Sequence, residues 1–411
     1  MKILMISTTF PYPPSRGGTQ VRTFNFMKYL SQKHAVTLVT QSGEEVGDRE
    51  IEQLRGCVSE LRVFRRPKNS PENRLKLFKK LQRFGRFIQT GIPPSVLSSY
   101  SIEMQEAIDA YASDRAHDVV TCEHSVNEIY VRPEWCDRLP TVANIHSSIY
   151  GTYRQQVETS TSEKPLRDRV QLPLIRRYER GYCRKFSALV VTTEDDARQF
   201  REFGTEARLE IIANGVDFDE FTPRERDPGG YRIVFIGAMD NLPNIDAARF
   251  FALEVLPLVQ IRYPETTFEI AGARPVPSVL ELQNLRGVTV TGTVPAIADY
   301  LHQATVCVVP MRTGYGIKNK TLQAMAAGTP VVASDRGLEG LKVDGSEVPL
   351  RALRANQVNE YVYAVGRLFE DRRLREQLSR QGRKMVEREY NWEILGRRYE
   401  QLLLELVESR P

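Results

Sequence analysis

The stretch Thr305–Asp335 reads TVCVVPMRTGYGIKNKTLQAMAAGTPVVASD, and the interpretation of the whole chain starts from it. It begins with a short apolar, β-branched run at Thr305–Pro310, which is typical of a buried parallel strand. After a loop with two glycines, Lys318–Ala327 carries apolar residues at helical spacing, and Gly328 stands where a helix commonly ends. A second apolar run at Pro330–Ser334 predicts another strand. The order is therefore strand, glycine-rich turn, helix and strand.

The turn in this stretch has features of an anion site. A turn that opens a helix behind a parallel strand offers unpaired backbone N–H groups and the positive end of the helix dipole. Arg312, Lys318 and Lys320 add positive charge there. Two interpretations fit the loop by itself: a nucleotide diphosphate site, or an ordinary strand–helix corner with solvated lysines.

The composition is that of an ordinary globular protein. A length of 411 residues predicts two domains of about 200 residues each. The apolar run at the N-terminus is short for a signal peptide, and no run reaches the roughly 18 residues of a membrane span. The formal net charge of +5 permits contact with phosphates or an anionic surface without indicating nucleic acid.

The five cysteines have no close paired spacing. This pattern predicts free thiols in a reducing compartment, with neither a disulfide frame nor a zinc site. We therefore expect a protein of a reducing compartment such as the cytoplasm.

The first half opens with a strand–helix–strand pattern. Strands are expected at Lys2–Ser7 and His34–Thr40, with a helix at Gln20–Leu30 between them. Gly17 and Gly18 stand at the carboxyl end of the first strand, just before the helix. Paired glycines there permit close approach of a ligand to the backbone, and a tight turn with no ligand is the alternative.

Further strands are expected at Asp118–Cys122, Pro140–Ile145 and Ala188–Thr192. His146 and Glu194 follow the second and third of these strands. Open α/β sheets bind ligands at the carboxyl ends of their strands, so both side chains are site candidates. A lone loop histidine is more commonly structural, so position alone does not decide its role.

A basic amphipathic helix is expected at Arg74–Ile88, in a region with no acidic residue between Glu72 and Glu103. One interpretation places this helix on an anionic membrane surface with its phenylalanines inserted. The other, which we favour, packs its apolar face on the protein's own sheet and leaves the basic face in water.

The second half repeats the pattern of parallel strands and glycine turns. Strands expected at Tyr231–Ile236 and Thr267–Ala271 end in Gly237 and Gly272. The sequence thus predicts an α/β protein with two Rossmann-like parallel-sheet domains facing each other across a cleft, which is a common ligand site. The expected parts are a first domain at 1–217, a linker at 218–230, a second domain at 231–390 and a C-terminal helix at 391–411.

The ordered set of motifs resembles a family 4 glycosyltransferase, a retaining enzyme of the GT-B fold, over nearly the whole chain. No single motif decides the resemblance, but all occur in the family's order. They are Pro13 to Gly18, Asn214-Gly215-Val216-Asp217, Gly237, Ala271-Gly272, Thr291-Gly292, the stretch from Gly314 to Val332, and the helix that starts near Trp392.

The resemblance implies an activity. Such an enzyme transfers a hexose from a nucleotide-diphosphate sugar, UDP or GDP most often, to a polysaccharide, glycolipid or other acceptor. It retains the anomeric configuration and needs neither a catalytic metal nor a separate cofactor. A cytosolic pool of nucleotide sugars fits the expected compartment, and the Arg74–Ile88 helix is the candidate contact with the inner face of the cell membrane. The last helix would cross back to the first domain.

The resemblance also implies residue roles. Gly17 and Gly18 would approach the donor diphosphate, which Arg312 and Lys318 would hold. His146 would lie near the transferred sugar as a hydrogen-bonding or polarising residue, because the departing phosphate oxygen can take the acceptor's proton. The remaining donor-binding candidates are Gly237, Gly272, Gly314, Tyr315, Gly316, Ile317 and Gln323.

This chain departs from the family's frequent signature of two glutamates separated by seven residues. Tyr315 and Gln323 stand at those positions, so neither carboxylate is present. Gln323 can still accept a hydrogen bond through its amide oxygen, but without charge assistance. Asn241 and Asn244 stand in the region where a basic pair is often found.

Two alternatives stay open, and the departures at Tyr315 and Gln323 motivate the second of them. A nucleotide-sugar epimerase of the same fold would need acidic and histidine side chains at the site, for which Glu123, His124, His146 and Glu194 are the candidates. A non-catalytic binding or regulatory protein that kept the fold is the other alternative.

Overall fold

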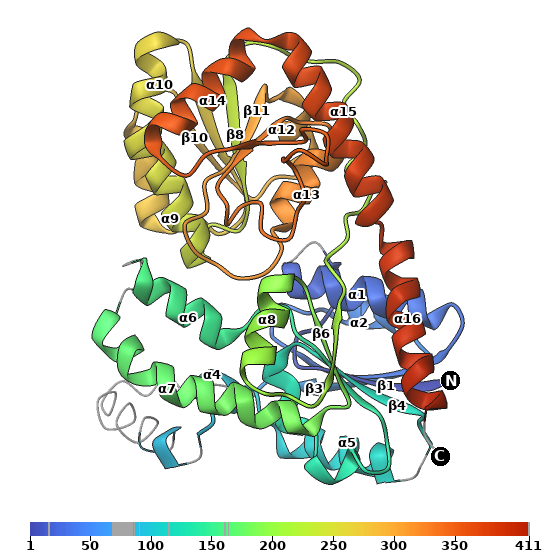
Figure 1. Ribbon diagram of the computed structural model, residues 1–411. Coiled ribbons are helices and arrows are strands. Elements are labelled where there is room, and N and C mark those ends of the chain that lie inside the picture. The colour runs from blue at the N-terminus through green and yellow to red at the C-terminus, as the bar shows by residue number, and fades with distance from the viewer. Residues whose placement is uncertain are drawn as a thin grey trace. The chain divides into compact units, whose positions relative to one another are not determined.

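The computed structural model describes residues 1–14, 17–67, 85, 87–89, 91–113, 116–159, 162 and 164–409. They form two compact units, which are described separately (Figure 1). Unit 1 comprises Met1–Ile212 with Leu395–Pro411, and unit 2 comprises Ala213–Ile394. The basic helix expected at Arg74–Ile88 lies outside the described residues, apart from residues 85, 87 and 88.

Unit 1 is a parallel sheet flanked by helices, with the strand order β3-β2-β1-β4-β5-β6-β7. Its strands are β1 (Lys2–Ser7), β2 (Ala35–Ser42), β3 (Glu60–Arg65), β4 (Val119–Glu123), β5 (Thr141–Asn144), β6 (Ala188–Val191) and β7 (Arg208–Ile211). Its helices are α1 (Gly18–Ser31), α2 (Asp48–Arg55), α4 (Pro94–Leu97), α5 (Ile102–Ser113), α6 (Ile149–Glu158), α7 (Pro165–Tyr182), α8 (Glu194–Glu202) and most of α16 (Trp392–Glu408).

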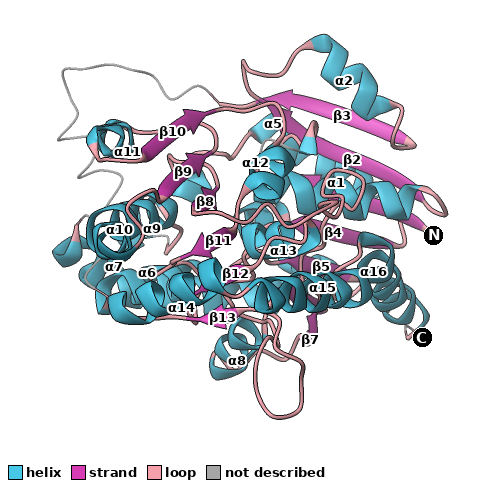
Figure 2. Ribbon diagram, turned by 90° about the horizontal axis from the view of Figure 1, so that it is seen from above, coloured by secondary structure: helices cyan, strands magenta, loops and turns pink. Residues whose placement is uncertain are grey.

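Unit 2 is a second parallel sheet, with the order β10-β9-β8-β11-β12-β13, which can be followed from strand to strand in Figure 2. Its strands are β8 (Arg232–Ile236), β9 (Thr267–Ala271), β10 (Val288–Gly292), β11 (Val306–Val309), β12 (Val331–Ala333) and β13 (Leu353–Arg354). Its helices are α9 (Leu242–Phe250), α10 (Leu256–Arg262), α11 (Pro277–Leu280), α12 (Ile297–Gln303), α13 (Asn319–Ala326), α14 (Val358–Glu370) and α15 (Arg372–Glu389).

The two expected Rossmann-like parallel sheets are confirmed, and each contains a point where the strand order reverses. In unit 1 the reversal lies between β1 and β4, and in unit 2 between β8 and β11. The register in unit 2 pairs Val306 with Ile233 and Cys307 with Val234. Because all the strands are parallel, the loops after β8 and β11 leave the same edge of the sheet on either side of the reversal, where α/β sheets bind ligands.

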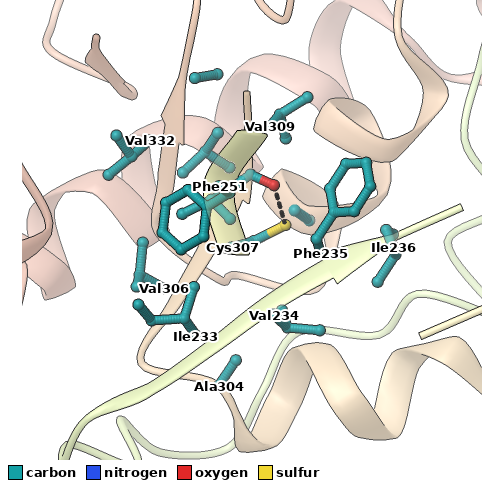
Figure 3. Close-up of a cluster of buried hydrophobic side chains, with 14 of the residues drawn as sticks. Ile233, Val234, Phe235, Ile236, Phe251, Ala304, Val306, Cys307, Val309 and Val332 are labelled. Atoms are coloured by element: carbon teal, nitrogen blue, oxygen red, sulfur yellow. Dashed lines mark hydrogen bonds between the residues drawn. The ribbon is translucent and has the colours of Figure 1, made fainter. Parts of the chain in front are cut away.

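The core of unit 2 surrounds these central strands. Ile233, Val234, Val306 and Cys307 are fully buried, which explains why both strands read as continuous apolar runs. Figure 3 shows Cys307 among them, and burial raises the pKa of its thiol to about 12. All five cysteines are free thiols, as expected from their spacing. Among the described residues, no helix is long and apolar enough to cross a membrane.

The residues around 213–217 belong structurally to unit 2. Val216 N–H donates to the Tyr390 carbonyl at 2.9 Å, and Asn214 Nδ2 donates to Asn319 Oδ1 at 2.8 Å. A Cβ on Gly215 would lie 2.6 Å from the Trp392 ring, so only glycine fits there. The boundary between the units therefore falls at Ala213, a few residues before the domain end expected from the sequence.

In unit 1, helix α16 packs closely against α1. Tyr29 Oη donates to Glu400 Oε2 at 3.0 Å, and Lys33 Nζ and His34 Nε2 contact the same carboxylate at 3.0 and 2.9 Å. Gly396 faces the buried Tyr29 ring, and a Cβ there would overlap that ring. The close helix contact therefore requires a glycine.

We predict that Gly396→Ala lowers the free energy of unfolding by about 1–3 kcal/mol, the usual cost of overpacking a filled interior. Urea unfolding measures this change. Gly181→Ala is the matched control, because a Cβ on this α7 glycine would meet no atom within 4 Å. A Gly396→Ala chain as stable as the control would contradict the packing described here.

Candidate functional site

The candidate site of unit 2 begins with two glycines at the carboxyl ends of neighbouring strands. Gly237 follows β8 and Gly272 follows β9, with φ angles of 149° and 151°, which disfavour any other residue. A Cβ on Gly272 would overlap the Gly237 carbonyl oxygen. A Cβ on Gly237 would lie 2.9 Å from Asn244 Nδ2 and 3.3 Å from Lys320 Nζ. Gly272 therefore lets the chain after β9 approach the chain after β8 closely, and Gly237 leaves the space in which Lys320 lies.

Lys320, in the first turn of α13, holds its ammonium at this edge. Its Nζ donates to Asn244 Oδ1 at 2.8 Å and lies 5.4 Å from the centre of the Phe235 ring. Burial, together with the nearby positive charge of Lys318, lowers the pKa of this lysine to about 8. Within unit 2, all of which the structure describes, no carboxylate forms an ion pair with Lys320. The edge therefore carries positive charge that no acid of this unit neutralises.

Lys318 makes a different set of contacts. Its Nζ lies 3.1 Å from Glu339 Oε2 and also donates to the Gly316 carbonyl. Arg336 contacts the same carboxylate oxygen at 3.0 Å, so one buried acid serves two basic groups. Lys318 thus fixes the loop before α13, and its charge is partly neutralised by Glu339.

Arg312 lies against helix α9. Its guanidinium is bidentate to Asp246, with Nε 2.8 Å from Oδ2, and its centre lies 5.0 Å from the Phe250 ring. This hydrogen bonding with Asp246 raises the pKa of Arg312. The structure therefore brings Lys318 and Lys320 to the strand edge, while an acid on α9 holds Arg312.

The remaining candidates of unit 2 line the same loop and helix. Gly314 and Gly316 take φ values of 101° and 80°, which turn the chain between β11 and α13. Ile317 is buried, and the Tyr315 ring has the Arg336 guanidinium 5.1 Å from its centre. Gln323 lies one helical turn after Asn319 and is half-buried. The loop thus presents its backbone beside the lysines, with an aromatic ring where the family places a carboxylate.

The candidate histidine of unit 1 lies beside a second histidine. His124 and His146 follow β4 and β5, and their rings meet edge to face with centroids 4.9 Å apart. Burial lowers the pKa of His124 to about 4. Burial also lowers the pKa of His146 well below its usual range, and the neighbouring His124 and Arg22 contribute to that lowering. Both imidazoles are therefore neutral at pH 7. Among the described residues, no hydrogen-bond partner faces the buried His146 Nε2.

A buried polar network supports this edge of unit 1. Arg22 Nε donates to Asn144 Oδ1 at 2.7 Å, and Asn144 Nδ2 donates to Glu123 Oε2 at 2.8 Å. Tyr399, on α16, donates to Glu123 Oε1 at 3.2 Å. Burial lowers the pKa of Arg22 to about 10 and raises that of Glu123 to about 7. Glu123 is therefore occupied by the network, and Arg22 also donates to the Ile212 carbonyl at 2.9 Å.

The other unit 1 candidates lie at helix starts. Helix α1 begins at Gly18, and the Gly17 carbonyl accepts from Val21 N–H at 3.0 Å. Gly17 has an extended φ of 173°, which any residue adopts. A glycine at this position therefore matters for the space that a side chain would fill, and not for its backbone conformation. Glu194 starts α8 and pairs with Arg201 at 2.5 Å on the surface. No group of three or more metal-ligating side chains occurs among the described residues.

One hollow of unit 2 lies away from this site. A cavity of about 500 Å³ is lined by residues at the starts of β8 and β9, including Arg232 and Thr267. The parallel strands that end at the candidate site begin at the opposite edge of the sheet. This hollow therefore lies at the edge away from the candidate site.

Comparison with known proteins agrees with this arrangement. Residues 16–220 match the family described as Glycosyltransferase Family 4, and residues 230–371 match the family described as Glycosyl transferases group 1. The two parallel sheets and these matches define a glycosyltransferase of the GT-B fold. The chain belongs to family 4 of the glycosyltransferases.

Characterised relatives are distant. The chain is 24% identical over 370 residues, 79% of this chain and 93% of the relative, to a GDP-mannose-dependent monoacylated alpha-(1-6)-phosphatidylinositol monomannoside mannosyltransferase of Corynebacterium glutamicum. It is 29% identical over 184 residues, 39% of this chain, to a D-inositol 3-phosphate glycosyltransferase of Rhodococcus erythropolis. The matched region spans less than half, 41%, of that second relative.

Solved structures share the fold at low identity. The sucrose-phosphate synthase of Thermosynechococcus elongatus superposes with a TM-score of 0.68 at 20% identity, covering 100% of both chains. Alr3699/HepE of Anabaena, solved in complex with UDP-glucose, superposes with a TM-score of 0.64 at 13% identity, covering 98% of this chain and 100% of that chain.

The buried Lys320 predicts a specific pH dependence of stability. Its pKa is about 8 in the folded chain and about 10.4 in an unfolded one, so folding is penalised while the ammonium is charged. The penalty is full below pH 8 and is relieved as pH rises from about 8 to 10.4. Lys320→Met should therefore gain stability relative to the wild type at pH 7 and lose most of that relative gain by pH 10.

Urea unfolding of both chains at pH 7 and pH 10 measures this difference. Lys384→Met is the control, because Lys384 is exposed and its removal should give the same difference at both pH values. A Lys320→Met effect that is independent of pH would contradict the burial of a charged ammonium.

Proposed function

We propose that this chain transfers a hexose from a nucleotide-diphosphate sugar to a carbohydrate or lipid-linked acceptor, with retention of configuration and without a catalytic metal. The observation that carries the proposal is the unneutralised ammonium of Lys320 beside Gly237, at the point in unit 2 where the strand order reverses. A buried positive charge at such an edge suits a diphosphate. The solved GT-B structure that contains UDP-glucose supports a donor of this class.

In this proposal unit 2 holds the donor and stabilises its leaving group. When the bond between the anomeric carbon and the phosphate oxygen breaks, negative charge develops on the nucleoside diphosphate. In this proposal Lys320 and the backbone N–H groups of residues 314–317 stabilise that charge, and Lys318 holds the loop to which those N–H groups belong. Preorganised charge of this kind commonly supplies the largest part of catalysis.

Loss of the family's carboxylates changes the donor contacts. We assign the hydroxyl groups of the nucleotide ribose to Gln323, whose amide oxygen accepts without charge assistance. We assign Tyr315 to packing against the donor, because its ring is held beside Arg336. The donor base stays open between UDP and GDP: the mannosyltransferase relatives are GDP-mannose-dependent, while the GT-B structure carries UDP-glucose.

In unit 1 we assign His146 to hydrogen bonding with the reacting sugar. Its pKa lies well below neutral because of burial, so it is an uncharged imidazole at pH 7. The departing phosphate oxygen takes the proton from the acceptor hydroxyl, so no separate strong base is required. We also propose a cytoplasmic location with contact at the inner face of the cell membrane, since two relatives are named for phosphatidylinositol mannosides.

We predict that Lys320→Met lowers kcat/KM by about 100-fold, the effect of removing one charge-stabilising group. The assay follows sugar release and transfer with UDP-, GDP- and ADP-sugars over a panel of glycan and glycolipid acceptors. Lys384→Met, an exposed lysine of the same unit, should leave kcat/KM unchanged. Equal activity of the wild type and Lys320→Met would remove Lys320 from the diphosphate site.

The same assay tests the proposed reaction. We expect weak sugar release without acceptor and transfer when an acceptor is present. EDTA should leave the activity unchanged, and the transferred sugar should keep the donor's anomeric configuration. Conversion of one nucleotide sugar into another would instead establish an epimerase. Binding without turnover across every donor and acceptor would establish a non-catalytic protein.

A further inference from the structure

Unit 1 contains a basic groove that the reaction described above does not use. It has a volume of about 410 Å³ and lies between helices α6 and α7. Its lining residues are Tyr150, Leu172, Pro173, Arg176, Arg177 and Arg180. A groove of this size is large enough for a small ligand.

The charge of the groove is entirely positive. Among the described residues, Arg176, Arg177 and Arg180 form no ion pair or hydrogen bond. Helix α7 has two acids, Asp168 and Glu179, and both are buried. The exposed charges of α7 are therefore all arginines, and three of them line one groove.

The acids of α7 are occupied elsewhere. Asp168 pairs with Arg167 at 2.7 Å, near the start of the helix. The acid of α6, Glu158, is eight residues after Tyr150, or about 12 Å along the helix at 1.5 Å per residue. No acid of α6 or α7 is thus placed to neutralise the three guanidinium groups.

Glu179 fixes the position of the groove relative to the sheet of unit 1. Its carboxylate accepts from Ser148 Oγ at 2.6 Å, from Ile149 N–H at 2.8 Å and from Tyr150 N–H at 3.2 Å. This carboxylate ties the C-terminal half of α7 to the first turn of α6. Because α6 begins three residues after His146, the groove lies by the carboxyl edge of the sheet.

We propose that this groove binds the phosphate group of a phosphorylated acceptor, which rests on the transferase function proposed above. Guanidinium groups match phosphate oxygens in a bidentate geometry, and three of them can neutralise a dianion. The Tyr150 ring, with the Arg154 guanidinium 5.4 Å from its centre, gives the groove a flat wall. The groove thus selects acceptors that carry a phosphate.

Calorimetric titration with inorganic pyrophosphate tests the groove directly. The full-length wild-type chain should show two independent sites, one in this groove and one at Lys320. The R176Q/R177Q/R180Q variant should lose the first site, with an affinity about tenfold or more weaker. The control variant R49Q/R65Q/R138Q removes the same charge from exposed arginines of unit 1 and should keep both sites.

Two outcomes separate this proposal from the proposed function. A groove variant that melts at the wild-type temperature and still binds pyrophosphate at both sites would overturn the groove assignment. Lys320→Met should lose only the other site, and its failure to do so would count against the donor site while leaving the groove intact.

A second arm distinguishes a phosphorylated acceptor from a lipid surface. Flotation is measured with vesicles of phosphatidylglycerol and of phosphatidylcholine. We expect the three arginines to determine pyrophosphate binding in free solution. Arginine-dependent flotation on phosphatidylglycerol vesicles without an arginine-dependent pyrophosphate site would overturn the proposal, because the groove would then contact a membrane.

Discussion

The buried positive charge at the edge of unit 2 is the constraint on which the site depends. Two lysines two residues apart, Lys318 and Lys320, place their ammonium groups there. Glu339 balances the first, while the described partners of the second are uncharged, namely the amide of Asn244 and the ring of Phe235. A desolvated ammonium group beside a second ammonium group is unfavourable, and for this reason the pKa of Lys320 is lowered to about 8. An anion bound at this edge would relieve the cost.

The fold creates this edge through the ends of its central strands. β8 and β11 are buried strands of the core, and the order of strands reverses between them. Gly237 leaves free the space that Lys320 and Asn244 occupy, and Gly272 leaves room for the backbone of Gly237. Unit 1 uses a different solution: its buried charges, Arg22 and Glu123, are linked through Asn144.

The sequence predicted the parts that depend on local pattern. The β11–α13 stretch was identifiable because apolar runs, glycines and helical spacing all agree. Helix α6 was missed, because its sequence IYGTYRQQVE has a glycine and little apolar periodicity. Contacts between distant residues could not be predicted: Asp246, which holds Arg312, is 66 residues away from it. The sequence showed Lys320 only as one of three basic residues in this stretch. Its special position could not be predicted, because it depends on Gly237 and Asn244 in other elements.

A crystal structure of the chain with a bound nucleoside diphosphate, UDP or GDP, tests the central claim most directly. The account predicts diphosphate oxygens within hydrogen-bonding distance of Lys320 Nζ and of the backbone N–H groups of residues 314–317. The ion pair between Lys318 and Glu339 should persist beside them. A diphosphate bound away from Gly237 and Lys320, with the Lys320 ammonium still donating to Asn244, would contradict this account.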